Sequence, residues 1–198
     1  MKFDRQSLTA RIAVLALLGS PIVASVPAVT AKTYDDQETA ALAQALPGGK
    51  ISLLEGLRQV GKGDEAAISA KFEFDDKHKL SLSVYTAGKG AMVDAEHNVL
   101  KEFSGSPEAT AWTPQVEVFK DIPHVARASE HLTLMSVSHF TLADIVERAQ
   151  KRHKGTVFSV TPAVLGKHPV AVVLISDKGK IVELDIDMAT GQRVSGGR

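Results

Sequence analysis

The feature that most constrains this chain is an order of secondary-structure signals that occurs twice. Each occurrence opens with a hydroxyl residue, a leucine and an acid three positions on: Ser52-Leu53-Leu54-Glu55 and Thr141-Leu142-Ala143-Asp144. The hydroxyl can accept a free backbone N–H while the acid reaches back, which is a capping box at a helix start. Because internal repeats reveal architecture before any single motif does, we expect two copies of one small unit.

Alternating apolar and polar residues follow each helix signal, as in half-buried strands. In the first copy, residues 68–74 and 80–85 form a hairpin around the turn-forming residues 75–78, and Ala91–Asp94 is expected to be the third strand. In the second copy, strands are expected at about Thr156–Leu165, Val170–Ser176 and Lys180–Asp187. Both copies then close on an Asp-containing turn, with Asn98 or Gly191 in the left-handed conformation.

The remaining segments connect these two units. An Ala-rich stretch from Asp36 to Leu46 predicts a short helix, ended by Pro47-Gly48-Gly49. Between the units, Asp121-Ile122-Pro123 is typical of a helix start, and this helix is expected to run to roughly Met135. Trp112 is expected to pack between the two units.

The expected fold class is therefore α+β, with two repeats that each consist of a helix and a three-stranded antiparallel sheet, joined by a partly helical connector. The expected divisions are a signal peptide (1–31), an N-terminal helical arm (32–50), repeat 1 (51–101), the connector (102–140) and repeat 2 (141–198).

The first thirty-one residues are typical of an export signal. Lys2, Arg5 and Arg11 precede a short apolar run, and Val29-Thr30-Ala31 offers the small residues that signal peptidase prefers, so cleavage is expected after Ala31. The alternative is a retained anchor, because Ile12–Ala31 contains no charged residue. Gly19, Ser20 and two prolines in that run favour cleavage, and the expected location is periplasmic or secreted.

Composition excludes several function classes. The chain has no cysteine, so disulfides, thiolate metal sites and cysteine nucleophiles are ruled out. The formal net charge is zero for 198 residues, and it becomes −2 when residues 1–31 are removed. A nucleic-acid partner is therefore disfavoured, because phosphate binding depends on concentrated Lys and Arg.

Candidate chemistry is weak throughout. The chain has seven histidines, and His124, Glu130, His131 and His139 lie in one region, but His124 and His131 are seven positions apart instead of the four that suit a zinc-binding helix. The segment Gly56–Gly63 resembles a phosphate loop but is better interpreted as a helix C-cap. The row Glu183, Asp185 and Asp187 is interpreted as a solvated strand face. We therefore assign no catalytic, cofactor-binding or metal-ligating residue and expect no cofactor.

The repeats resemble the PepSY domain family, which occurs in propeptides of thermolysin-like secreted metallopeptidases and in many exported bacterial proteins. The residues that carry the resemblance are the Ser/Thr-Leu helix starts, Val84-Tyr85, and the run Asp187-Met-Ala-Thr-Gly-Gln-Arg-Val194, which is similar to the family's closing D-x-x-T-G-x-V pattern. The first copy departs from that pattern, with Glu96-His97-Asn98 in place of Ala-Thr-Gly.

The resemblance implies a non-catalytic, exported binding or regulatory module of the bacterial cell envelope, one that modulates a secreted peptidase or serves in sensing. A protein or peptide partner is expected, and a sheet edge offers a physical route to bind it. Contact with a membrane is expected only if the leader is kept as an anchor. The alternative is a periplasmic carrier of a metal ion or small molecule that uses the scattered histidines.

Overall fold

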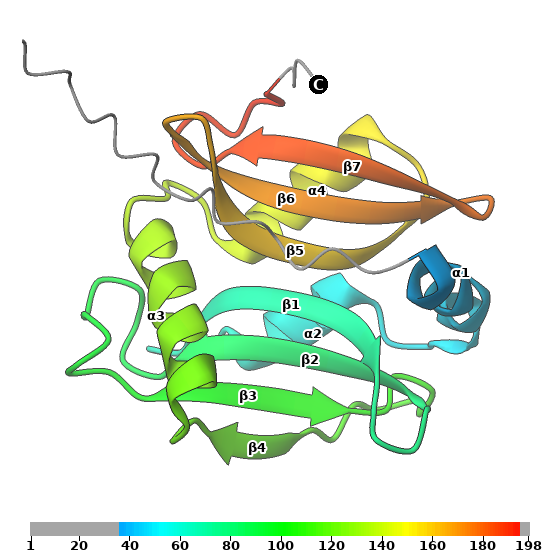
Figure 1. Ribbon diagram of the computed structural model, residues 1–198, viewed down its shortest axis with the longest axis horizontal. Coiled ribbons are helices and arrows are strands. Elements are labelled where there is room, and N and C mark those ends of the chain that lie inside the picture. The colour runs from blue at the N-terminus through cyan, green and yellow to red at the C-terminus, as the bar shows by residue number, and fades with distance from the viewer. Residues whose placement is uncertain (1–35, 195–198) are drawn as a thin grey trace, which may run out of the picture.

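The computed structural model describes residues 36–194, so the expected leader lies outside the described residues. Within these residues the chain forms four α-helices, one short 3-10 turn and a single sheet, and the helices lie around the sheet (Figure 1). The helical elements are α1 (Asp36–Ala45), η1 (Leu46–Gly48), α2 (Leu53–Val60), α3 (Ile122–Ser136) and α4 (Leu142–Arg152). The strands are β1 (Ala66–Phe74), β2 (Leu80–Ala87), β3 (Leu100–Gly105), β4 (Gln115–Val118), β5 (Thr156–Leu165), β6 (His168–Asp177) and β7 (Lys180–Asp187).

All seven strands belong to one antiparallel sheet with the order β4-β3-β2-β1-β5-β6-β7. Each half contains a helix followed by a three-stranded meander, α2-β1-β2-β3 and α4-β5-β6-β7, which confirms the α+β class. The halves join where β1 pairs with β5, through Ala70 opposite Val160 and Lys71 opposite Ser159. Strand β4 extends the first half by one strand beyond the expected three.

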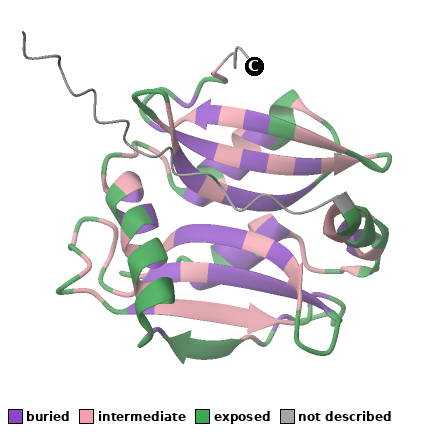
Figure 2. Cartoon of the chain, viewed as in Figure 1, coloured by how far each residue is buried: buried purple, intermediate pink, exposed green. Residues whose placement is uncertain are grey.

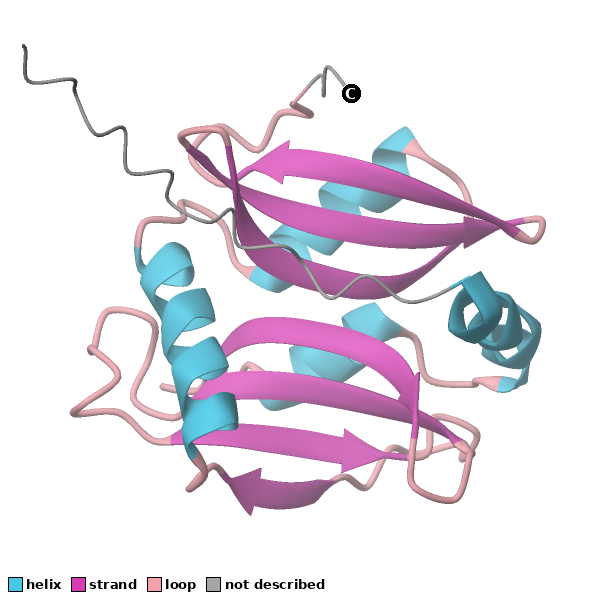
Figure 3. Ribbon diagram, in the orientation of Figure 1, coloured by secondary structure: helices cyan, strands magenta, loops and turns pink. Residues whose placement is uncertain are grey.

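The sheet is covered on both faces, by α2 and α4 on one side and by α3 on the other (Figure 3). Alternation along β1 explains this arrangement. Ala70 and Phe72 are buried on the side of α2 and α4, whereas Ser69 and Lys71 project toward α3. Figure 2 shows that the central strands β2 and β5 are buried along most of their length, as expected for strands that are covered on both faces. The helix α1 packs near β1 at the end of the sheet.

Both expected capping boxes are present. The Glu55 N–H donates to Ser52 Oγ (3.2 Å), and the Ser52 N–H donates to a Glu55 carboxylate oxygen (2.7 Å). Thr141 and Asp144 make the equivalent pair at 3.2 and 3.0 Å. The residues that resemble a phosphate loop end α2, because the Gly61 N–H donates to the Leu57 carbonyl oxygen (2.9 Å). The C-cap interpretation is confirmed.

The loop after β2 differs from the sequence-based expectation. Residues 91–94 form no strand; the third strand is β3, which begins six residues later. Asn98 fixes this loop instead, because its side-chain amide donates to the carbonyl oxygens of Gly90 and Val93, both at 2.9 Å. Asn98 is not left-handed, so that prediction is wrong, whereas Gly191 has φ +68° as expected.

The connector contains both an expected and an unexpected feature. Helix α3 is confirmed, with Asp121 as N-cap accepting the His124 N–H (3.1 Å). Trp112 is buried, but its hydrogen bonds lie in the first half. Its Nε1 donates to the Gly105 carbonyl oxygen (3.2 Å), and the Gln59 side-chain amide donates to the Trp112 carbonyl oxygen (2.7 Å). The expected position between the two units is therefore wrong. No helix within residues 36–194 has the length and hydropathy to cross a membrane.

Candidate functional site

A cavity of about 390 Å³ lies between α3 and the sheet, where the two halves meet. Residues from β1, β2, β5, β6 and the connector contribute to its walls, so neither half forms it alone. Its volume lies within the range of small-ligand pockets. The lining residues are Ser69, Ala70, Lys71, Tyr85, Phe119, Pro123, His124, Arg127, Ala128, Glu130, His131, Ser159, Thr161, Pro162, Val172 and Leu174.

The pairing of β1 with β5 places hydroxyl groups from both halves along the sheet side of this cavity. Lys71 lies opposite Ser159 in the ladder, and side chains on one face of a strand recur at every second position. Ser69 and Thr161 therefore continue the same face, and Val172 and Leu174 extend it onto β6. The cavity combines hydrogen-bonding groups from the centre of the sheet with an apolar surface next to them.

His131 anchors α3 to the sheet inside this cavity. Its side chain is buried, and Nδ1 lies 3.1 Å from the equally buried Ser69 Oγ. Burial, with the Arg127 charge adding to it, lowers the pKa of His131 from 6.5 to about 4. The ring is therefore neutral at neutral pH, and the contact with Ser69 is a hydrogen bond between neutral groups.

A serine beside a histidine also occurs in nucleophilic enzymes, but this pair lacks the other parts of such a site. In a catalytic triad a carboxylate orients the imidazole, and backbone N–H groups stabilise the oxyanion. Within residues 36–194, no carboxylate is hydrogen-bonded to His131. Ser69 is also only 5% exposed, and it lies in the middle of β1, where it is paired with β2. The geometry favours a structural contact.

The two basic side chains of the cavity, Lys71 and Arg127, differ in whether a carboxylate forms an ion pair with them. Lys71 forms an ion pair with Glu73, which also accepts a hydrogen bond from Tyr85 Oη (3.4 Å). Arg127 is exposed and forms no ion pair within the described part of the chain. The cavity therefore keeps one uncompensated guanidinium group at its surface.

Aromatic rings form another part of the wall. The Phe119 ring stacks on Tyr85 (centroids 5.9 Å apart) and on His124 (5.2 Å). His124 is held in turn by Asp121, whose carboxylate lies 2.8 Å from Nδ1 and whose pKa is lowered by the backbone and side-chain hydrogen bonds of His124. The stack fixes the start of α3 relative to β2.

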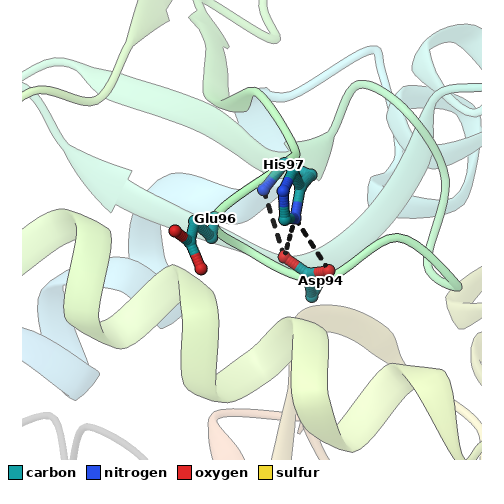
Figure 4. A group of neighbouring side chains, drawn as sticks. All are labelled: Asp94, Glu96 and His97. Carbon is teal, nitrogen blue, oxygen red and sulfur yellow. Dashed lines mark hydrogen bonds and ion pairs between the residues drawn. The ribbon is translucent and has the colours of Figure 1, made fainter.

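The histidine region considered as a metal site does not converge. His124 bonds to Asp121, His131 contacts Ser69, and the side chain of His139 is exposed. Within residues 36–194, three possible ligands come together only at Asp94, Glu96 and His97, in the loop after β2 (Figure 4). No sequence pattern predicted this cluster. All three side chains are exposed, and the Asp94 carboxylate already bonds to His97 Nδ1 (2.9 Å).

The acidic row of β7 lies on the α3 side of the sheet. Glu183 is opposite Leu174 and Asp185 is opposite Val172, and both of these partners line the cavity. Asp187 has a different role, because its Oδ1 accepts the N–H groups of Ala189 (3.0 Å) and Thr190 (2.7 Å). Asp187 therefore holds the turn after β7, whose sequence resembles the closing pattern of the repeats.

Residues 141–192 match the profile of the PepSY family, described as "Peptidase propeptide and YPEB domain". No curated protein matches the chain. One solved structure that is similar comes from Clostridium difficile 630 and is described as a candidate lipoprotein. It shares 14% sequence identity, with a TM-score of 0.37 over 74% of this chain and 92% of that chain, and a score of this size does not define a shared fold. The expected resemblance to the PepSY family is therefore confirmed for residues 141–192, and the match does not extend to the rest of the chain.

Proposed function

We propose that this protein is an exported, non-catalytic module of the bacterial cell envelope. It binds a segment of a partner protein in the cavity under α3, and this partner is a peptidase. The PepSY match supports a binding or regulatory role, since the family includes peptidase propeptides. The observation that carries the proposal is the position of the cavity: both halves and the connector contribute to it, so the arrangement of the whole fold determines its shape.

The lining suits a peptide segment. Ser69, Ser159 and Thr161 supply hydrogen-bonding hydroxyls, while Val172 and Leu174 supply apolar surface beside them. A volume of about 390 Å³ is enough for one or two side chains but not for a folded element. A partner would therefore insert side chains from an extended or looped segment and keep the rest of its surface outside.

The test combines identification of the partner with a measurement of its activity. The full chain is produced with a photo-reactive residue at position 161, and cross-linked proteins are identified from the intact envelope. Thr156 lies on the same strand, is exposed and does not line the cavity, so a photo-reactive residue at that position is the matched control. We expect a cross-link to an exported peptidase from position 161 only.

The peptidase is then assayed with and without the purified chain. Inhibition or activation that Thr161→Trp removes and Thr156→Trp keeps would support the proposal, because a tryptophan at position 161 fills the cavity. An unchanged peptidase activity at saturating amounts of the chain would refute the regulatory role. The purified chain alone is expected to hydrolyse no peptide substrate, and turnover that a single conservative substitution abolishes would contradict its non-catalytic nature.

The carrier function is tested separately. The histidines on which it depends lie apart in the described residues, so no arrangement of theirs favours it. Equilibrium dialysis against zinc, copper and iron decides between the two functions, because a carrier must bind one metal ion per chain and the proposed module need not.

A further inference from the structure

Strand β4 leaves one edge of the sheet open. It is the last strand in the order, it pairs with β3 over four residues, and all four of its side chains are exposed (Figure 2). An unpaired edge presents backbone N–H and C=O groups that another strand can use. Among residues 36–194, no segment pairs with the outer side of β4.

The opposite edge of the sheet, at β7, is partly paired. Beside β7, the chain's own end turns back, so that Arg193 pairs with Ile186 and the Val194 N–H donates to the Asp185 carbonyl oxygen (2.8 Å). The C-terminal half of β7 is therefore already occupied by an extended segment of the same chain. This shows that the sheet accepts such a segment at an edge, and it leaves β4 as the fully accessible edge of the described structure.

The α3-facing side of β4 carries unbalanced negative charge. Glu117 lies directly opposite Glu102 of β3, and like charges at such positions destabilise a pair of strands. Neither carboxylate forms an ion pair within the described residues. Burial raises the pKa of Glu102, and the carboxylates of Glu73 and Glu117 act in the same direction, although the Ser83 hydrogen bond and the Lys71 charge oppose them. A positive group beside this pair would remove the repulsion.

The other side of β4 is apolar. Val116 is 54% exposed and lies opposite Phe103, and Val118 is 45% exposed. Natural edge strands usually carry lysine, proline or a bulge that discourages pairing, and none of these occurs within the four residues of β4. The edge therefore presents carboxylates on one side, valines on the other, and an accessible backbone between them.

We propose that β4 takes up an extended segment of a partner protein in which basic and apolar side chains alternate. This inference rests on the proposed function as a protein-binding module, and it names a second contact surface and the chemistry of the partner. Basic side chains of the added strand would lie beside Glu117, one strand away from Glu102, while its apolar side chains would cover Val116 and Val118. A second copy of this chain fits less well, because pairing β4 with β4 would bring a second pair of carboxylates to the same edge.

The experiment measures binding of a defined probe to the full chain. A fluorescent hexapeptide of alternating lysine and valine, with both ends blocked, is titrated with the protein and followed by fluorescence anisotropy. One control peptide replaces lysine with glutamate. A second keeps lysine and valine but carries an N-methyl group on every backbone amide, which removes the N–H donors from both edges of the strand. Glu117→Lys tests the edge, and Glu183→Lys makes the same charge change on the exposed face of β7.

We expect saturable binding of the lysine–valine peptide alone, with protection of the β4 amides from hydrogen exchange. Glu117→Lys should weaken this binding about tenfold, since it replaces an attractive cross-strand pair with a repulsive one, whereas Glu183→Lys and Thr161→Trp should leave it unchanged. Fluorescence of the buried Trp112 confirms that each variant is folded, and Val118→Lys replaces Glu117→Lys if the latter fails to fold.

Equal binding of the N-methylated peptide, equal weakening by Glu117→Lys and Glu183→Lys, or dimerisation of the protein through β4 would overturn the proposal. Its failure is distinguishable from failure of the proposed function. If the cavity is not a binding site, Thr161→Trp has no effect on the peptidase partner whatever the peptide does at β4. If β4 is not a docking edge, the effect of Thr161→Trp on the partner remains.

Discussion

Replacing His131 with glutamine should remove a specific part of the pH dependence of this protein's stability. His131 connects α3 to the sheet through Ser69 and is 7% exposed. Its pKa is 6.5 when exposed and about 4 in the fold, chiefly because of burial. The fold therefore favours the neutral ring, so the unfolded chain binds the additional proton between these two values. The stabilisation is complete above pH 6.5 and is lost as the pH falls toward 4.

The size of the effect follows from the two pKa values. At pH 4.5 the unfolded histidine is almost fully protonated and the folded one is mostly neutral, which costs the fold about 2.5 kcal/mol relative to pH 7.5. Glutamine has no proton to gain in this range, yet it keeps a polar group beside Ser69. The difference in unfolding free energy between wild type and His131→Gln should therefore change by about 2.5 kcal/mol between the two pH values.

Urea denaturation followed by the fluorescence of Trp112, the single tryptophan, measures this difference. Carboxylates whose pKa values are lowered in the fold, such as Asp121, are present in both proteins and cancel in the comparison. His139→Gln, at an exposed histidine of the same connector, is the matched control for the substitution itself. A difference between wild type and His131→Gln that is the same at both pH values would refute the reasoning.

Three further substitutions test the local structure. Asp187→Ala should lower the unfolding free energy by about 1–2 kcal/mol at pH 7, because it removes the acceptor of the Thr190 N–H. That hydrogen bond also holds the pKa of Asp187 below its usual 3.8, so the difference between wild type and variant in urea denaturation should persist at pH 5 and disappear as the pH falls through the lowered value. Gly155→Ala should destabilise the fold by roughly 3 kcal/mol, since its Cβ would meet the Ser176 carbonyl oxygen at 2.5 Å and φ is +133°. Gly166→Ala, with φ +65° but open space around it, should cost about 1 kcal/mol in the same urea denaturation experiment, and equal losses for the two glycines would contradict the packing argument.

Much of the fold was predictable from the sequence because its signals are local. The capping boxes at Ser52 and Thr141 depend on residues three positions apart, and the period-two alternation of β5 and β7 gave their exact bounds. The expected strand at residues 91–94 failed because Asn98 binds backbone groups up to nine positions away, which no short-range pattern reports. Strand β4 alternates polar and apolar residues over only four positions, all of them exposed, and so short a run does not by itself predict a strand.

The candidate site could not be predicted in the same way. The cavity depends on the pairing of β1 with β5, whose contacts join residues about ninety positions apart through only two pairs. The sequence indicated His131 only as a possible metal ligand, because its contact with Ser69 arises only when α3 packs across that junction. The division of the chain at 51–101, 102–140 and 141–198 remains a prediction, and the family match covers only the last unit.

The most direct test of the account is the affinity of the cross-linked peptidase for wild type, Thr161→Trp and Thr156→Trp, measured by isothermal titration calorimetry. If the cavity at the junction of the two halves holds the partner, Thr161→Trp should weaken binding at least about tenfold, while Thr156→Trp should bind as wild type does. Equal affinities for the three proteins would contradict the central claim.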